Sequence, residues 1–483
     1  MPGPRCTSAG VGGGEVVGDD VCARVFATGL GKPRGVVVVG PADVVVVDAA
    51  SGGRLVRVWD GDADGVSSGS ERAVVHSGNL GLNHGVEVVD KWLYASSKDA
   101  VYRFELPSGW AKDRDNSVLG DPVKVVDGMG AGSAQVRPGD ATVAGHVTRT
   151  LRAGGGDLFI SVGSAGNVDP DPFRSAIRRV KLADLASVTS EKEALWFVNL
   201  EVFASGVRNE VALAVDPRDG ALWGAENAAD GVRREDLGEH GVLHQDNPAE
   251  ELNRFGGAAS GQFYGYPYCF SEFSIAPSRG GQGPGTQWVW QGPVRNFSNH
   301  GWTDEKCQNV SEVVPPVKVM QAHSAPLGMT FVVCVAPPGD DLGAFNSSDY
   351  VPLPCAWTSN LLVAFHGSWN RDVPTGYKVV RMDLDVESRE ADAFQTDVLR
   401  SANHPESAVW DSGARPVDVV QDPDLGIAYV TSDTTGEVFA LSGALPSGDT
   451  FSDAASDVSP TLSPHNGLIL LASISMFLAR GWT

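Results

Sequence analysis

One pattern of residues recurs six times along the chain and constrains its fold more than any other feature. Each copy has a basic residue, a short apolar strand, a turn, a second apolar strand, and then a glycine and a third strand. A repeat of this kind is typical of a β-propeller, in which each copy forms one sheet, or blade. The basic residues that open the copies are Arg34, His84, His146, Arg208, His323 and Arg415.

The spacing of these residues predicts the number of blades and the position of the insertions. The first three spacings are 50, 62 and 62 residues, which suits a four-stranded blade of about 40–50 residues plus loops. The next two, of 115 and 92 residues, predict insertions near residues 234–320 and 334–360. The 58 glycines and 29 prolines also favour strands and turns over long helices. We expect an all-β, six-bladed β-propeller over residues 25–445, with an N-terminal segment 1–24 and a tail 446–483.

The six basic residues predict an anion-binding site. In a propeller the start of each innermost strand lies beside the central channel, so these side chains would meet at one end of it. The alternative is that each of them only satisfies neighbouring carbonyl groups. The chain as a whole carries a formal net charge of −23, which argues against a nucleic-acid partner. The ring would therefore bind a small anion.

The cysteines and the glycosylation sequons predict an oxidising compartment, at the cell surface or outside the cell. No Cys-x-x-Cys motif is present, which favours disulfides over a metal ribbon. Six cysteines allow 15 pairings, and we expect the local ones, Cys6 with Cys22, Cys269 with Cys307 and Cys334 with Cys355. The sequons begin at Asn296, Asn309 and Asn346, within or beside the two predicted insertions.

The two ends of the chain give different indications about its location. The first residues lack the apolar core of a signal peptide. The C-terminal end has small residues at 452–456, a polar spacer to 466 and an apolar run over 467–479. This order is that of a lipid-attachment (GPI) signal, and it predicts contact with a membrane only through a C-terminal lipid anchor. A disordered or amphipathic tail is the alternative.

Two short segments carry the chemistry expected at the channel mouth. His146 is the natural proton acceptor near neutral pH, and nearby arginines favour its neutral, basic form. The segment Phe365–Arg371 places an imidazole, an indole and a guanidinium close together. This combination suits a flat, aromatic, anionic ligand, with Trp369 stacking on it and Arg371 pairing with a carboxylate.

An acidic turn has the spacing of a calcium-binding loop. Its residues Asp60, Asp62, Asp64 and Glu71 fit the EF-hand pattern, but a strand precedes them where a helix is required. A calcium loop between blade strands and a solvated acidic turn both remain open.

Nine short motifs, in this order, resemble the soluble pyrroloquinoline-quinone (PQQ) sugar dehydrogenases, particularly the pyranose and L-sorbosone dehydrogenase branch. The resemblance covers residues from about 32 to 441 and implies a six-bladed propeller. The motifs are Pro33–Gly35, Asn83–Gly85, Gly145–Leu151, Gly206–Asn209, Asn247–Asn253, Tyr264–Cys269, Ala322–Gly328, His366–Arg371 with Gly376–Lys378, and Arg415–Asp418.

The resemblance implies the site residues. His146 would take the proton from a sugar hydroxyl while hydride passes to the quinone. Arg208 and Asn209 would contact the quinone oxygens, and Arg34, His366, Trp369 and Arg415 would bind PQQ. The cofactor calcium would lie on the turn Asn227, Ala228, Ala229 and Asp230, and a second cation near Glu250 and Glu251. Gly145 and Ser164 stand where the bacterial glucose dehydrogenases have aspartates, so another group must orient the base.

We therefore predict a PQQ- and calcium-dependent dehydrogenase that oxidises an aldose, a pyranose or an aldehyde sugar. It would pass electrons to an external acceptor such as a cytochrome. Two other functions remain open. A calcium-dependent sugar lactonase would need a channel metal held by several carboxylates, and a cell-surface recognition propeller would keep the blades without the catalysis.

Overall fold

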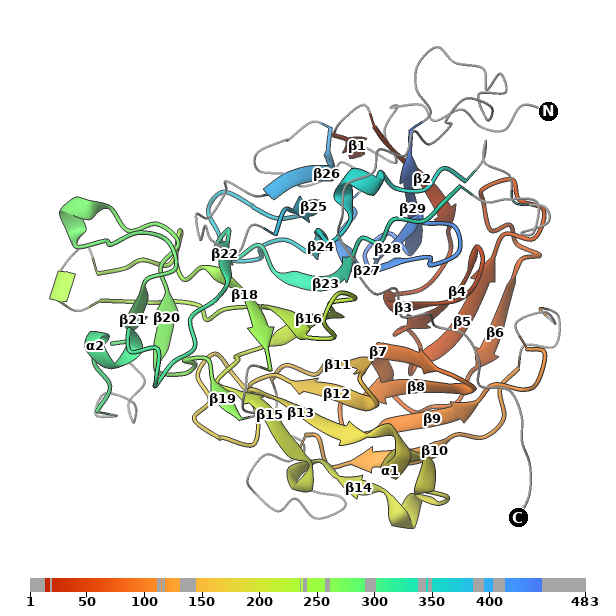
Figure 1. The fold of residues 1–483 in the computed structure, drawn as a ribbon, viewed down its shortest axis with the longest axis horizontal. Helices are drawn as coiled ribbons and strands as arrows, with labels where there is room; N and C mark the ends of the chain where they lie inside the picture. The colour runs from red at the N-terminus through yellow and green to blue at the C-terminus, as the bar shows by residue number, and fades with distance from the viewer. Residues whose placement is uncertain are drawn as a thin grey trace, which may run out of the picture. The chain divides into compact units, whose positions relative to one another are not determined.

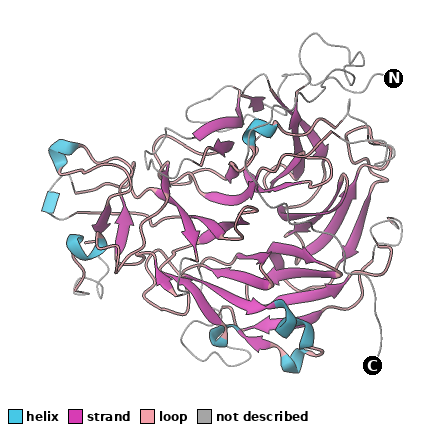
Figure 2. Cartoon of the chain, in the orientation of Figure 1, coloured by secondary structure: helices cyan, strands magenta, loops and turns pink. Residues whose placement is uncertain are grey.

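The computed structural model describes residues 14–17, 20–110, 114, 118–130, 145–234, 236–237, 241–256, 261–291, 301–337, 345, 350–384, 395–402 and 413–444. The chain divides into two compact units, Met1–Leu445 and Pro446–Thr483, and all described residues belong to the first. Strands dominate this unit (Figure 2).

Short runs of apolar, mostly β-branched residues bounded by turns explain why the chain forms strands. Strand β4 (Asp43–Asp48) is an example, with four valines between two aspartates and every residue buried. A continuous apolar run of this kind is typical of a strand that is buried on both faces. The carboxylate of Asp48 accepts hydrogen bonds from the backbone N–H groups of Gly31, Lys32 and Ala50, and so holds the neighbouring turns.

The described strands form six sheets of four or five strands and one hairpin (Figure 1). The first three blades contain β3 (Pro33–Gly40), β4, β5 (Arg54–Trp59) and β6 (Arg72–His76); β7 (Leu82–Val89), β8 (Trp92–Ser97), β9 (Val101–Glu105), β10 (Val123–Asp127) and β14 (Leu195–Trp196); and β11 (Arg149–Gly154), β12 (Asp157–Val162), β13 (Ala176–Lys181), β15 (Glu201–Ser205) and β19 (Gln262–Phe263).

The other three blades follow in chain order. They contain β16 (Glu210–Val215), β17 (Leu222–Glu226), β18 (Glu250–Phe255) and β22 (Lys318–Met320); β23 (Pro326–Phe331), β24 (Leu361–Phe365), β25 (Lys378–Met382), β26 (Gln395–Ser401) and β1 (Gly14–Val16); and β27 (Pro416–Gln421), β28 (Ala428–Ser432), β29 (Glu437–Gly443) and β2 (Val21–Ala27).

The innermost strands close a ring. Strand β3 contacts β7, and the contacts continue through β11, β16, β23 and β27 back to β3. This arrangement confirms the predicted six-bladed, all-β propeller, and apolar clusters fill the space between neighbouring blades.

The N-terminal boundary differs from the expected one at residue 25. Strand β2 pairs antiparallel with β29 and completes the sixth blade, and β1 pairs antiparallel with β26 at the edge of the fifth. Residues 14–16 and 21–24 therefore belong to the propeller. The outermost strand of the last blade comes from the start of the chain, which closes the ring through backbone hydrogen bonds between the two ends.

The predicted insertions lie within the fourth and fifth blades. The first, between β18 and β22, contains β19, the hairpin of β20 (Cys269–Ser271) and β21 (Gln287–Val289), and the helix α2 (Asp304–Cys307). The second lies between β23 and β24. The disulfides Cys269–Cys307 and Cys334–Cys355 staple them, as predicted. Cys22 is disulfide-bonded too, and its expected partner, Cys6, lies outside the described residues.

Helices are few in the described part of the chain. Apart from α2 they are α1 (Leu182–Ser187) and the 3₁₀ turns Glu191–Glu193, Phe197–Asn199, Pro277–Arg279 and Cys355–Trp357. None of the helices in the described residues is long and apolar enough to cross a membrane. The predicted lipid-attachment segment at 452–479 lies outside the described residues.

Candidate active site

The six basic residues of the repeat all lie at the starts of the innermost strands. Arg34 is the second residue of β3 and His84 the third residue of β7, and the other four come one to three residues before β11, β16, β23 and β27. Gly35 follows Arg34 and Gly85 follows His84, and because glycine has no Cβ, these glycines allow neighbouring inner strands to approach closely. A Cβ at Gly35 would lie 2.0 Å from the carbonyl oxygen of His84, and one at Gly85 would lie 2.2 Å from that of Arg149.

His146 is held by one residue, Ser164. Its Nδ1 lies 3.0 Å from both the carbonyl oxygen and the Oγ of Ser164, and that hydroxyl donates to the carbonyl of Gly166. A carbonyl oxygen can only accept, so Nδ1 carries the proton and Nε2 keeps its lone pair. Burial lowers the pKa of His146 to about 4, with the positive charges of Arg208 and Arg149 acting in the same direction. His146 is therefore a neutral base near neutral pH.

Asn209 lies beside this base. A Cβ added at Gly163 would lie 2.2 Å from the Oδ1 of Asn209 and 2.9 Å from the Cβ of His146. The glycine thus lets the side chains of His146 and Asn209 pack against the same short segment.

Arg208 lies in a cage of oxygens. Its Nη1 donates to the carbonyl oxygens of Asn227 (3.0 Å) and Ala228 (2.8 Å). Its Nη2 approaches the Oδ1 of Asn167 (3.1 Å) and the Oδ2 of Asp230 (3.3 Å), and its Nε donates to the carbonyl of Asn167 at 3.3 Å. The two carbonyls expected to hold calcium thus face the guanidinium, whereas Ala229 packs its side chain in an apolar cluster.

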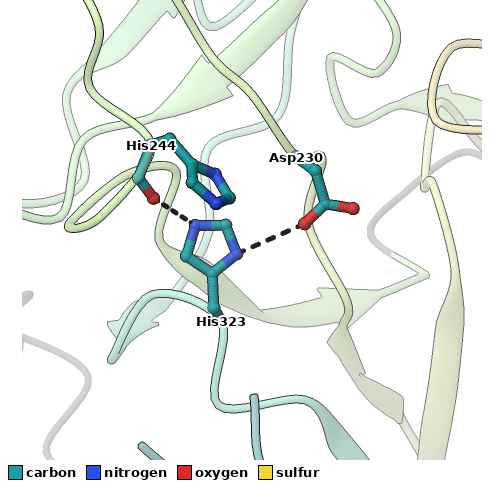
Figure 3. Close-up of side chains that lie close together, drawn as sticks. All are labelled: Asp230, His244 and His323. Atoms are coloured by element: carbon teal, nitrogen blue, oxygen red, sulfur yellow. Dashed lines mark hydrogen bonds and ion pairs between the residues drawn. The ribbon is translucent and has the colours of Figure 1, made fainter. Parts of the chain in front are cut away.

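Asp230 connects Arg208 to a pair of histidines. Its Oδ1 lies 3.5 Å from the Nδ1 of His323 and accepts a 2.7 Å hydrogen bond from Asn370, and the rings of His244 and His323 are 4.5 Å apart (Figure 3). Burial raises the pKa of Asp230, but the hydrogen bond from His323 and the charge of Arg208 outweigh it and bring it to about 2. Asp230 is therefore an anion among donors.

A second cluster of polar side chains connects other residues at the starts of the inner strands. Asp433 accepts from Arg34 Nη1 at 2.7 Å and from His366 Nε2 at 2.9 Å, and Arg415 donates to the carbonyls of His366 and Gly367. Asp433 and three of the predicted cofactor-binding residues, Arg34, His366 and Arg415, therefore form one connected cluster, here called the Asp433 cluster.

The loop after β24 carries the remaining two predicted cofactor-binding residues, Trp369 and Arg371. Trp369 is 80% exposed, so its ring is free to stack on a ligand. Arg371 donates to the carbonyl of Ala322 and to Asp246, and its Nε is buried without a hydrogen-bond partner in the described part of the chain.

Glu250 and Glu251, near which a second cation is expected, lie on opposite faces of their sheet. They are successive residues of β18, so their side chains point to opposite faces of the sheet. Glu250 accepts from the backbone N–H groups of Ala228 and Ala325, and burial raises its pKa to about 7. Glu251 lies in register with Glu226, which lies in register with Glu210. The two carboxylates therefore lie in different surroundings, and a cation near this segment stays a prediction.

The acidic turn joins β5 and β6, as the sequence predicted. Ligand atoms of Asp60, Asp62 and Glu71 lie within 4.8 Å of one another. The carboxylate of Asp64 instead accepts from the N–H of Val66, and Tyr350 hydrogen-bonds to Asp60. Calcium binding at this turn stays a prediction.

The side chains present fit the groups that the resemblance implies. Oxygen ligands suit calcium, and the carbonyls of Asn227 and Ala228 already face one cation, the guanidinium. An anionic, aromatic cofactor matches the Asp433 cluster and the exposed Trp369. Next to Arg34, the Nδ1 of the buried His84 has no hydrogen-bond partner among the described residues.

Some residues of this site were missed in the sequence. Asp433 lies 399 positions from Arg34; it ends the second strand of the sixth repeat copy, but the repeat assigned it no role. Asn167 could have been singled out from the glycine-rich turn that follows β12, and Asn370 from its place between Trp369 and Arg371.

The comparisons with known proteins identify the family. The TrAA12-like family matches residues 15–444. The chain therefore belongs to the TrAA12-like family, in agreement with the resemblance seen in its motifs.

Named relatives and solved structures agree. The chain is 27% identical to a pyrroloquinoline quinone-dependent sugar dehydrogenase of Hypocrea jecorina, over 88% of this chain and 89% of that one. It is 28% identical to a pyrroloquinoline quinone-dependent pyranose dehydrogenase of Coprinopsis cinerea, over 86% of this chain but 52% of the relative. This chain thus matches about half the length of the second relative.

Two solved structures resemble the propeller closely. The calcium structure of the family AA12 enzyme of Trichoderma reesei superposes with a TM-score of 0.70 at 26% identity, covering 91% of this chain and 100% of that one. The holo form of the pyranose dehydrogenase PQQ domain from Coprinopsis cinerea gives 0.68 at 25% identity, covering 91% and 98%.

Proposed function

We propose that this protein is a PQQ-dependent sugar dehydrogenase that oxidises an aldose, a pyranose or an aldehyde sugar. The observation that carries the proposal is the fixed tautomer of His146 beside Arg208 and Asn209. A base with its lone pair on Nε2 and a pKa near 4 is ready to accept a hydroxyl proton at neutral pH. Membership of the TrAA12-like family supports the same activity.

Each group of the site has a role in this reaction. When bound, PQQ supplies the acceptor for the two electrons that leave the sugar carbon as hydride. His146 Nε2 accepts the hydroxyl proton, and Ser164 keeps the other ring nitrogen protonated. Arg34, His366 and Arg415 would bind the cofactor, Arg371 would pair with one of its carboxylates, and Trp369 would stack on its flat face. Asn209 would contact a quinone oxygen.

Calcium is the second cofactor of the proposal. Its ligands would be the carbonyls of the turn 227–230 and the carboxylate of Asp230, oxygen donors of the type that calcium prefers. Near the quinone carbonyl a divalent cation stabilises negative charge, a role that arginines share.

The structure gives the lactonase alternative no support within the described residues. That activity needs a channel metal held by several carboxylates, whereas a basic residue lies at, or one to three positions before, the start of each inner strand. PQQ binding distinguishes the dehydrogenase from the recognition propeller.

Location and electron acceptor complete the proposal. Two intact disulfides and the exposed sequon residue Asn309 support a place outside the cell or on its surface. Electrons would leave to an external acceptor such as a cytochrome, and the segment 467–479 would direct lipid attachment.

Titration of the metal-depleted protein with PQQ, with and without calcium, tests the proposal. We expect saturable one-to-one binding seen as a change in quinone absorbance. The matched variant Arg415→Gln removes one cation of the Asp433 cluster and should weaken binding at least tenfold. Absence of binding under both conditions would contradict the proposal and favour the recognition propeller.

A further inference from the structure

The oxygen cage around Arg208 uses the whole guanidinium. An arginine side chain has five N–H groups. Here Nε–H faces the carbonyl of Asn167, the Nη1 protons face the carbonyls of Asn227 and Ala228, and the Nη2 protons face Asn167 Oδ1 and Asp230 Oδ2. No N–H group is left for another acceptor, so Arg208 cannot also donate to a ligand in this arrangement.

The composition of the cage suits a metal ion as well as a guanidinium. It has three main-chain carbonyls, one amide oxygen and one carboxylate, and Ca²⁺ binds six to eight such oxygens. Asn167 supplies two of the five oxygens, from its main chain and its side chain, and its Oδ1 also accepts from the N–H of Asp230. The amide oxygen is therefore fixed in the cage.

We propose that Arg208 and the calcium ion of the proposed function occupy this cage in alternation, and that Asn167 is one of the ligands of the cation. Two cations cannot share the same carbonyl oxygens, because each would displace the other's donors and repel its charge. Entry of a divalent cation therefore turns the guanidinium out of the cage and frees its N–H groups. This inference rests on the proposed function, in which calcium lies on the turn 227–230, and it leaves Arg208 free for the contact with the quinone oxygens that the resemblance implies.

The cation-binding test needs no quinone. Calcium is titrated calorimetrically into metal-depleted wild-type protein and into Arg208→Gln, Arg208→Gln with Asn167→Ala, and Arg371→Gln. Sites elsewhere, including the acidic turn 60–71, are common to all four proteins and cancel in the comparison. Arg371→Gln is the matched control, since it removes the same charge from the channel mouth without touching the cage.

We expect Arg208→Gln to bind calcium at least tenfold more tightly than the wild type. Addition of Asn167→Ala should reverse most of that gain, and Arg371→Gln should stay within about threefold of the wild type. Equal affinity of the wild type and Arg208→Gln would overturn the alternation, and a gain insensitive to Asn167→Ala would overturn the ligand assignment.

A second variant covers a failure of Arg208→Gln to fold. Arg208→Lys keeps one charge but has fewer directed donors, so its calcium affinity should lie between those of the other two proteins; an affinity equal to or below the wild type's would contradict the alternation. Because no quinone is present, these outcomes are independent of whether the protein is a PQQ enzyme, which the PQQ titration decides.

Discussion

Ser164 holds the Nδ1 proton of His146 with two acceptors, its own carbonyl oxygen and its hydroxyl, each at 3.0 Å. The hydroxyl is itself fixed because it donates to the carbonyl of Gly166 at 2.6 Å. A serine therefore does what a carboxylate does in many catalytic histidine pairs, which is to set the tautomer and the orientation of the ring. It does so without adding a negative charge that would raise the pKa of the base.

Substitution Ser164→Ala should lower kcat about tenfold, because an orienting partner of a reactive histidine is typically worth about 10- to 100-fold and the carbonyl acceptor remains. KM should change little. Ser401→Ala is the control, since it removes a buried hydroxyl that has no hydrogen-bond partner in the described residues. Steady-state kinetics of both variants decide the matter, and a kcat for Ser164→Ala equal to that of the control would contradict the role.

The lowered pKa of His146 predicts the pH dependence of the reaction. Burial and then Arg208 disfavour the protonated ring and bring the pKa to about 4. The base is therefore neutral above that pH, and kcat/KM should be flat from about pH 5 to 7 and fall tenfold per unit on the acid side. Carbon NMR of ¹³C-labelled histidines, with His146→Gln to assign the signal, measures the pKa directly. A value near 6.5 would contradict the account.

Trp369 should contribute to cofactor binding and not to stability. Its side chain is 80% exposed, so Trp369→Ala removes little packing and should leave the thermal midpoint unchanged. Loss of aromatic stacking, worth about 0.5–1.5 kcal/mol beyond buried area, should raise the Kd for PQQ about tenfold. Trp196→Ala, at the edge of the second blade and 45% exposed, is the matched control. Equal Kd values for the two variants would exclude stacking by Trp369.

The Cys334–Cys355 disulfide should stabilise the propeller. It closes a segment with a sequence separation of 21, which corresponds to about 3 kcal/mol of unfolding free energy in the chain-entropy model. The double substitution Cys334→Ser with Cys355→Ser should lose that amount in urea denaturation. Cys269→Ser with Cys307→Ser, which opens a separation of 38, should lose slightly more. A change below about 1 kcal/mol in both would show that the insertions unfold independently of the blades.

The features that repeat along the chain were predictable from its sequence. Arg34 and His84 begin inner strands because the same alternation of strand, turn and strand surrounds each of them. The disulfide pairs in the insertions followed from short separations. The N-terminal strand β2 was not predicted, although the sixth copy showed only three strands and so required a fourth from elsewhere in the chain.

Contacts between distant parts of the chain were not predictable in the same way. Asp433 meets Arg34 only because the ring closes. The interaction of Arg208 with the turn carbonyls depends on where a long side chain ends, which the sequence does not specify.

The most direct test of the central claim is anaerobic, single-turnover reduction of protein-bound PQQ by a panel of aldoses and pyranoses, in the wild type and in His146→Gln. The account predicts that at least one sugar reduces the bound quinone in the wild type, seen in its absorbance, and that His146→Gln binds PQQ equally well but reduces it at least a hundredfold more slowly. Equal reduction rates in the two proteins would contradict the claim that His146 is the base.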